Sequence, residues 1–148
     1  MIKIHTLKKI FVSKHVETHV LKGIDLVIPE GQFIAIMGKS GAGKSTLMYQ
    51  MSLLDHPTSG LVEIDGVDAG GLSHNERTKL RLNSLGYIFQ DYALVPELTA
   101  GENVMVPLLM QGLSKEEAHR VALASLDTIG LSGKWKNLPS QLSGGEQQ

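Results

Sequence analysis

The sequence predicts an α/β fold with a β-rich N-terminal part and a helical C-terminal part. Apolar and polar residues alternate over residues 2–7, which is the period of a half-buried strand. After Gly71, apolar residues instead recur at helical spacing. Between these regions a glycine-rich stretch at residues 38–45 follows a short apolar run and precedes a helical pattern. These three observations together indicate an α/β core with a strand–loop–helix unit.

The expected strands are short and are bounded by turn residues. They cover residues 2–7, 20–28, 33–37, 61–64 and 85–89. Glu30 and Gly31 form the turn before the third strand, and Asp65 and Gly66 mark a tight hairpin turn that leads into Val67.

Four helices are expected, at residues 44–54, 75–82, 101–110 and 115–129. Three capping boxes mark helix starts, because a hydroxyl can bond the amide three residues on while a carboxylate bonds back. The pairs are Ser73 with Glu76, Thr99 with Glu102, and Ser114 with Glu117. Gly130 suits the left-handed residue that ends the last helix. One face of that helix, which should be buried, carries Ala118, Val121, Ala122, Ser125, Leu126 and Ile129.

A sub-domain boundary is expected near residues 94–99, where Pro96 breaks regular structure and helices begin to dominate. The core would then cover residues 1–93, and a helical sub-domain would cover residues 94–148.

The composition fits one globular domain, with 148 residues of which 42% are hydrophobic and 20% charged. Fourteen Lys and Arg against fifteen Asp and Glu give a net charge of −1, which disfavours nucleic acid as the main partner.

The longest apolar runs are far shorter than the ~20 residues that a membrane-spanning helix needs. There is no cysteine, so a cytoplasmic location is expected. The six histidines do not cluster, His15 and His19 lying alone in a polar segment, so no histidine metal site is expected.

Residues 38–45 fit the phosphate-binding pattern G-x-x-x-x-G-K-[ST] between a predicted strand and a predicted helix. Glycines let successive amide groups point at phosphate oxygens, and the helix adds its positive N-terminal end. Lys44 would reach the β- and γ-phosphates and the Ser45 hydroxyl would bind Mg²⁺. A glycine-rich turn with no ligand is the alternative. The candidate nucleotide-binding residues here are Gly38, Lys39, Ser40, Gly41, Ala42, Gly43, Lys44, Ser45 and Thr46.

Two further motifs follow in a fixed order. Gln90 comes directly after the predicted strand at 85–89, and the chain closes on Leu-Ser-Gly-Gly-Glu-Gln-Gln at residues 142–148. With the phosphate loop, these motifs resemble the nucleotide-binding domain of the ATP-binding cassette (ABC) family. The resemblance runs over the whole chain and implies the P-loop NTPase fold of ABC type, with ATP and Mg²⁺ as ligands.

The resemblance also implies roles for single residues. Gln90 would help to hold Mg²⁺ together with Ser45, and the loop after Gln90 would sense a membrane partner. Ser143, Gly144 and Gly145 would contact the γ-phosphate of ATP bound to a second copy, in a homodimer that encloses two nucleotides. Phe11 would stack on adenine, which needs only a flat π face.

Each of these residues also has a plainer interpretation from the sequence alone. Gln90 can be a polar residue at a strand end, and Phe11 can be a core phenylalanine. Ser143 and Glu146 have the spacing of a capping box, so the last motif can be a simple helix start. The same geometry exposes free amides and a positive helix end, which also suits an anion.

Residues 54–60 and 102–109 are similar to ATPases of the lipoprotein-release, macrolide-export and peptide-antibiotic-resistance group. This similarity implies an ATPase that lies peripherally on the cytoplasmic face of the membrane and drives an integral membrane permease. Lys39, where proline is common, and Ala42, where Ser or Gly is usual, depart from the group. Neither position supplies a side chain that the phosphate site needs.

Family members continue beyond the last motif with a strand that ends in Asp, then a catalytic Glu and later a histidine. The 148 residues contain none of these, so no catalytic base is assigned and negligible ATPase activity is expected for them alone. The C-terminal part of the core sheet is also missing, so we expect either a fragment of a longer protein or completion by another copy. A nucleotide-binding module without hydrolysis is therefore the alternative to a transporter ATPase. An ABC ATPase of DNA repair or translation is disfavoured by the charge.

Overall fold

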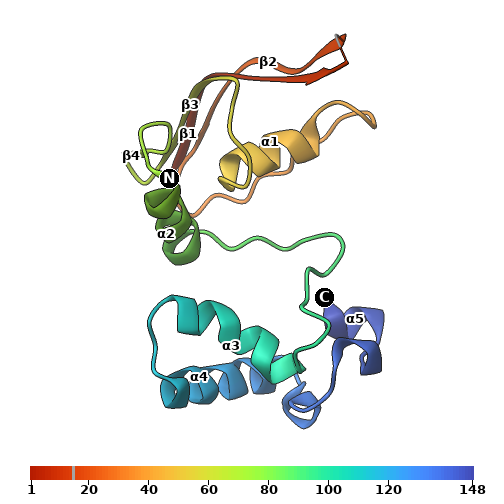
Figure 1. Ribbon diagram of the computed structural model, residues 1–148. Coiled ribbons are helices and arrows are strands. Elements are labelled where there is room, and N and C mark those ends of the chain that lie inside the picture. The colour runs from red at the N-terminus through yellow and green to blue at the C-terminus, as the bar shows by residue number, and fades with distance from the viewer. Residues whose placement is uncertain (15) are drawn as a thin grey trace. The chain divides into compact units, whose positions relative to one another are not determined.

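The computed structural model describes residues 1–14 and 16–148, so His15 lies outside the described residues (Figure 1). The chain forms two compact units, Met1–Arg81 and Leu82–Gln148, and each is described by itself. The sub-domain boundary expected near residues 94–99 stays a prediction.

The first unit is built on a four-stranded antiparallel sheet in the order β2-β1-β3-β4. The strands are β1 (Ile2–Ser13), β2 (Val16–Ile28), β3 (Ser59–Ile64) and β4 (Val67–Asp68). Asp65 and Gly66 both have positive φ, 48° and 83°, which confirms the predicted hairpin turn. β1 is longer than predicted because β2 pairs with it as far as Ser13. Helix α1 (Lys44–Met51) packs against β1 and β2, and α2 (His74–Ser84) begins in this unit and runs past its last residue, Arg81.

A close crossing of β1 and β3 requires glycine at position 60. The pairing of these strands shifts register between His5 and Lys8, and Thr6 has a left-handed φ of 47°. Gly60 has φ 94°, and a Cβ there would lie 2.5 Å from the carbonyl oxygen of Thr6 and 2.7 Å from that of His5. A side chain at this position would therefore meet backbone atoms that no rotamer change can move.

The buried core of this unit contains apolar side chains and the charged side chain of Arg77. The apolar residues include Ile4, Leu7, Leu21, Leu53, Val62 and Ile64. The Arg77 guanidinium donates to the carbonyl oxygens of Leu53 and Ala69, both at 3.3 Å, and Arg81 donates to Leu53 at 3.0 Å. Burial, and then the charge of Arg81, lower the pKa of Arg77. Backbone carbonyls thus compensate the buried charge and tie α2 to the segment after α1.

The strands predicted at residues 33–37 and 85–89 are wrong for this structure. Neither segment forms a strand of the sheet within the described residues. Phe33 is 96% exposed, Met37 87% and Ile88 79%. Apolar β-rich composition is local, whereas a strand also needs a partner whose N–H and C=O groups complete the ladder.

The second unit is helical. It contains α3 (Ala100–Met110), α4 (Lys115–Thr128), the 3₁₀ turns η1 (Ser132–Lys134) and η2 (Pro139–Gln141), and the short helix α5 (Gly144–Gln147). Capping boxes are present at Thr99, Ser114 and Ser143, and the equivalent bonds link Ser73 and Glu76 before α2. The predicted helix starts are therefore confirmed.

The core of the second unit lies between α3 and α4. Met105, Ala118 and Ala122 are buried there, and partly buried hydrophobic residues including Val104 and Trp135 pack against them. On the predicted α4 face, Ala118, Ala122 and Leu126 are buried, whereas Ser125 and Ile129 are exposed. The prediction for Ile129 is wrong because α4 ends at Thr128 and Gly130, with φ 75°, turns the chain away. The prediction for Ser125 is also wrong, since this residue lies on an exposed side of α4, where its hydroxyl donates to the Val121 carbonyl oxygen at 3.0 Å.

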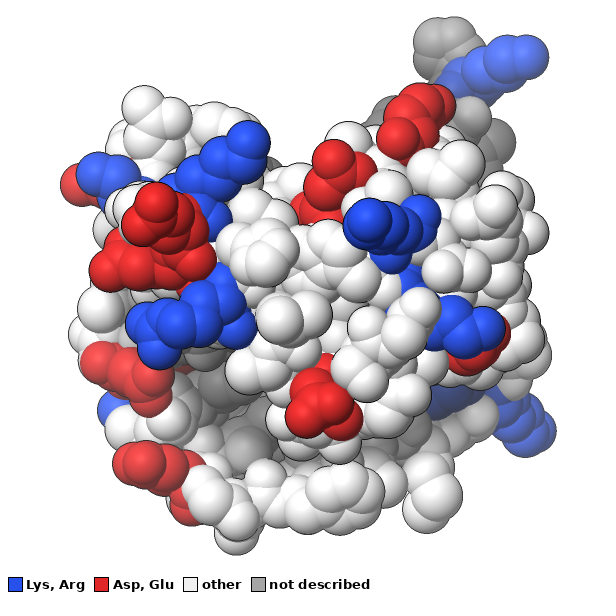
Figure 2. Space-filling model, turned by 90° about the horizontal axis from the view of Figure 1, so that it is seen from below, with Lys and Arg blue, Asp and Glu red and all other residues white. Residues whose placement is uncertain are grey.

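Both signs of charge occur together on the face of the molecule that Figure 2 draws. On the face drawn in Figure 2, acidic and basic side chains are interspersed around neutral surface, without one extended basic patch among the described residues. No described helix combines the length and apolar character needed to cross a membrane.

Candidate nucleotide-binding site

The phosphate loop curls tightly onto the start of α1 because a glycine precedes that helix. Gly43 is the N-cap residue with a left-handed φ of 88°, and Leu47 N donates to its carbonyl oxygen at 2.8 Å. A Cβ on Gly43 would lie 3.0 Å from Val20 Cγ1 and 3.2 Å from the Val20 carbonyl oxygen. Glycine therefore lets the loop approach β2, and it leaves the first amides of α1 free for a ligand.

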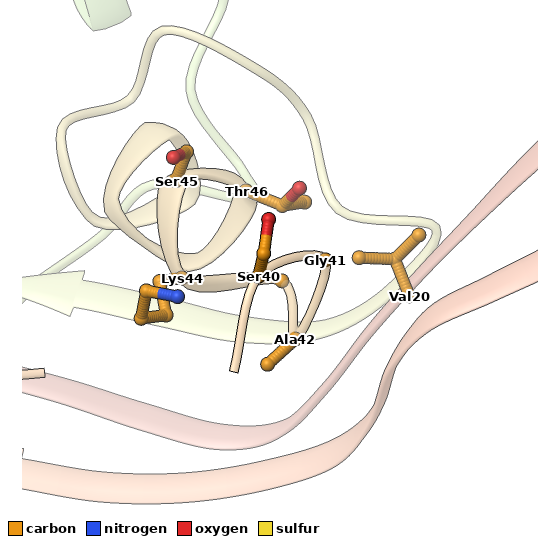
Figure 3. Close-up of a pocket in the computed structure, with 8 residues that line it drawn as sticks. Val20, Ser40, Gly41, Ala42, Lys44, Ser45 and Thr46 are labelled. Carbon is orange, nitrogen blue, oxygen red and sulfur yellow. The ribbon is translucent and has the colours of Figure 1, made fainter. Parts of the chain in front are cut away.

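An open hollow of about 350 Å³ lies at this loop. Val20 points toward the loop from β2, and the other lining residues come from the loop and the first turn of α1 (Figure 3). The lining residues are Val20, Ser40, Gly41, Ala42, Gly43, Lys44, Ser45 and Thr46. Of the predicted loop residues only Gly38 and Lys39 lie outside this lining. Val20 is the residue that the sequence analysis missed, since only the packing of β2 brings it to the loop.

Lys44 is held inside its own loop. Its Nζ donates to the carbonyl oxygens of Gly38 and Lys39, both at 2.9 Å. Ala42 N also donates to the carbonyl oxygen of Lys39 at 3.2 Å, which closes the turn. The ammonium group is therefore already positioned at the mouth of the loop, beside the start of α1.

These groups fit a nucleotide phosphate with Mg²⁺. A cation, free helix amides and a glycine that admits no Cβ surround the hollow, and no carboxylate among the described residues lines it. Ser45 is exposed at the first turn of α1, where its hydroxyl is the kind of hard oxygen ligand that Mg²⁺ accepts. No group of three or more His, Asp or Glu residues that could hold a metal occurs within residues 1–14 and 16–148.

Phe11 lies on β1 and is 46% exposed, so the interpretation as a core residue is wrong. The Nζ of Lys9 lies 5.0 Å from the centroid of its ring. One aromatic surface is thus accessible, and stacking on adenine stays a prediction.

Gln90 and the last motif both belong to the second unit. Gln90 is exposed, and its role at Mg²⁺ stays a prediction. Ser143 caps the four-residue helix α5, accepting from Glu146 N, while Glu146 accepts from Ser143 N at 2.7 Å. The capping interpretation of Ser143 is therefore confirmed, and the binding of a second copy's nucleotide by Ser143, Gly144 and Gly145 stays a prediction.

Glu146 is the one acidic side chain of this motif, and its pKa is strongly lowered. Hydrogen bonds from Ser143 and the nearby Lys134, whose Nζ lies 3.1 Å away, lower its pKa from 4.5 to about 2. Because the folded-state pKa lies below the unfolded value, this stabilisation is fully present above about pH 4.5 and is lost as the pH falls through about 2.

We expect NMR titration of the Glu146 carboxyl and the Ser143 amide to follow one transition near pH 2. Lys134→Ala should raise that midpoint while leaving it below 4.5, because the Ser143 bonds are the larger cause. Glu146→Gln should remove the transition at Ser143. A wild-type midpoint at 4.5 would contradict the capping box.

Comparison with known proteins identifies the family. The family described as "ABC transporter" matches residues 21–148. The chain is 45% identical over 97% of its length to the lipoprotein-releasing system ATP-binding protein LolD of Legionella pneumophila (strain Paris). It is also 43% identical, over its whole length, to the macrolide export ATP-binding/permease protein MacB of Aggregatibacter actinomycetemcomitans. The resemblance to the lipoprotein-release and macrolide-export group is thus confirmed.

A solved structure supports the fold. The dimeric ATP-binding cassette MJ0796, bound to ADP and Pi in a post-hydrolysis state, matches with a TM-score of 0.92 and 39% identity over 99% of this chain. The chain spans 64% of the Legionella LolD, 23% of that MacB and 65% of the MJ0796 chain. The chain therefore belongs to the ABC transporter family and has the α/β P-loop fold of its ATP-binding domains.

Proposed function

We propose that these residues bind Mg²⁺-ATP as part of an ATPase subunit that drives a membrane permease. The observation that carries this proposal is the loop of residues 38–45, where Lys44 and the free amides of α1 converge on one open hollow. Such a loop recognises the β- and γ-phosphates through backbone amides and one cation. The nucleotide supplies the phosphoanhydride bond whose hydrolysis powers transport.

Further contacts would come from other residues of the chain and from a second copy. Ser45 and Gln90 would hold Mg²⁺, and Phe11 would stack on adenine. Ser143, Gly144 and Gly145 would bind the γ-phosphate on the partner, so that a homodimer encloses two nucleotides. The dimeric MJ0796 cassette, which is 39% identical, supports this arrangement.

The permease would be one of an export or lipoprotein- or peptide-extrusion system. This proposal rests on the relatives, among them LolD, MacB and the pyoverdine export ATP-binding/permease protein PvdT of Pseudomonas fluorescens (strain Pf0-1), which is 47% identical over 89% of this chain. The chain would then act at the cytoplasmic face of the membrane. Copurification of a permease with the tagged intact protein tests this, and copurification of nucleic acid instead would contradict it.

Nucleotide binding can be tested directly with a fluorescent ATP analogue. We expect saturable binding in the presence of Mg²⁺ and weaker binding after chelation with EDTA, because a cation that Ser45 would help to hold would neutralise phosphate charge. Ser45→Ala should remove most of this dependence on Mg²⁺. Binding that is equal with and without Mg²⁺ in both proteins would contradict the assignment of Ser45.

For the 148 residues by themselves we propose binding without hydrolysis. No carboxylate among the described residues lines the hollow, so no side chain there is suited to polarise an attacking water. We expect phosphate release indistinguishable from that of Lys44→Ala. A turnover that Lys44→Ala abolishes would contradict this second proposal and leave the first intact.

A further inference from the structure

The loop after Gln90 has a strained backbone. Tyr92 and Ala93 are consecutive residues with left-handed φ angles of 58° and 55°, and neither is glycine. Ala93 N donates to the carbonyl oxygen of Asp91 at 2.6 Å, which tightens the turn. Because L-residues disfavour this conformation, surrounding contacts must hold the loop in place.

Both ends of this loop are tied within the second unit. On one side, the Gln148 side chain donates to the Phe89 carbonyl oxygen at 3.3 Å. On the other side, the Asn103 amide accepts from Val95 N at 2.8 Å and donates to the Val95 carbonyl oxygen at 3.1 Å. The segment between Phe89 and Val95 is thus a short span between two fixed points.

The middle of the span contacts the last motif. The Tyr92 hydroxyl lies 3.0 Å, and its Cζ 3.9 Å, from where a Cβ on Gly144 would stand. The absence of a side chain at Gly144 therefore leaves room for the Tyr92 ring. Leu94 lines a hollow of about 190 Å³ together with Leu142 and Gln147. The loop thus packs along α5, next to the chain terminus in Figure 1.

Helix α5 depends on such contacts because it has only four residues. The Ser143 capping box closes its start, and the Gln147 side chain donates to the carbonyl oxygens of Pro139 and Leu142, both at 3.0 Å. Tyr92 comes from outside the segment between η1 and Gln148, and it is the side chain nearest to the first residue of α5. Loss of the Tyr92 ring would free the first turn of α5 on the side of the loop.

We propose that Tyr92 is a positioning residue, which holds Gly144 and the start of α5 against the loop that follows Gln90. This inference rests on the proposed function, in which Ser143, Gly144 and Gly145 contact nucleotide on a second copy. A change in the loop at residues 90–93 would then be transmitted to those residues through one side chain. Tyr92 would act on ATP turnover without contributing to the phosphate loop of its own copy.

The test combines hydrogen exchange without nucleotide and steady-state kinetics of the intact protein. Tyr92→Ala should increase amide exchange at Glu146 and Gln147 about tenfold. It should lower kcat for ATP by a similar factor, while the affinity of a single copy for a fluorescent ATP analogue changes less than twofold. Tyr92→Phe should restore both properties to within about twofold, because the ring still reaches Gly144. Ile88→Ala, at an exposed residue just before this loop, is the matched control.

The proposal would be overturned if Tyr92→Ala left exchange and kcat unchanged, if it lowered nucleotide affinity as much as kcat, or if Tyr92→Phe behaved like Tyr92→Ala. Failure of the proposed function looks different. In that case the wild-type protein would not bind ATP, whereas the exchange measurement would still report whether Tyr92 holds α5.

Discussion

Lys44→Ala should weaken nucleotide binding by roughly 10- to 150-fold, the effect of losing a charge-assisted contact of ~1.5–3 kcal/mol. The Lys44 ammonium lies at the mouth of the hollow and would exchange its two carbonyl partners for phosphate oxygens. Titration with a fluorescent ATP analogue measures the change. An affinity unchanged from the wild-type protein would refute the phosphate site.

Lys22→Ala is the matched control for this variant. Lys22 is an exposed lysine on β2 of the same unit, and it does not line the hollow. Its removal changes the net charge by the same amount as Lys44→Ala, so we expect less than a twofold change in affinity. Equal losses in the two variants would indicate attraction by overall charge instead of a specific contact.

Gly60→Ala should destabilise the first unit by about 3 kcal/mol or more, since a left-handed alanine costs ~1–2 kcal/mol and overpacking typically costs ~1–3 kcal/mol. The added Cβ would lie 2.5 Å from the Thr6 carbonyl oxygen and 2.7 Å from Leu7 Cα. These are backbone atoms of β1, so the two strands must separate locally. Urea denaturation followed by circular dichroism measures the difference.

Gly66→Ala separates the two causes of that loss. Gly66 has a similar left-handed φ of 83°, but an added Cβ would meet nothing within 4 Å. The variant should therefore show only the backbone cost of ~1–2 kcal/mol. If Gly60→Ala were no more destabilising than Gly66→Ala, the close crossing of β1 and β3 would be wrong.

The features that the sequence predicted well are local ones. The capping boxes at Thr99, Ser114 and Ser143 depend on residues three positions apart, and the turn at residues 65–66 depends on two adjacent residues. The bend of residues 38–45 onto α1 likewise follows from its glycines and the helix start. Each of these patterns carries its own hydrogen-bond partners within the segment.

The features that the sequence could not predict depend on partners far away in the chain. Residues 33–37 have the composition of a strand but no pairing partner among the described residues. The length of β1 was set by β2, and the positive φ of Tyr92 accompanies its contact with Gly144, 52 positions later. In the same way, only the fold of β2 brings Val20 to the phosphate loop.

An anion that binds at the loop competes with two backbone carbonyl oxygens for the ammonium group of Lys44. The carbonyl oxygens of Gly38 and Lys39 engage two of the three N–H donors of the ammonium group, so an anion that accepts more than one hydrogen bond from it must displace one of these oxygens. A monovalent ion such as chloride offers one charge and no fixed array of acceptors, so it gains little from the exchange. A polyphosphate offers several charged oxygens to the lysine and to the helix amides together. The loop should thus favour a polyphosphate over the simple anions of the solution.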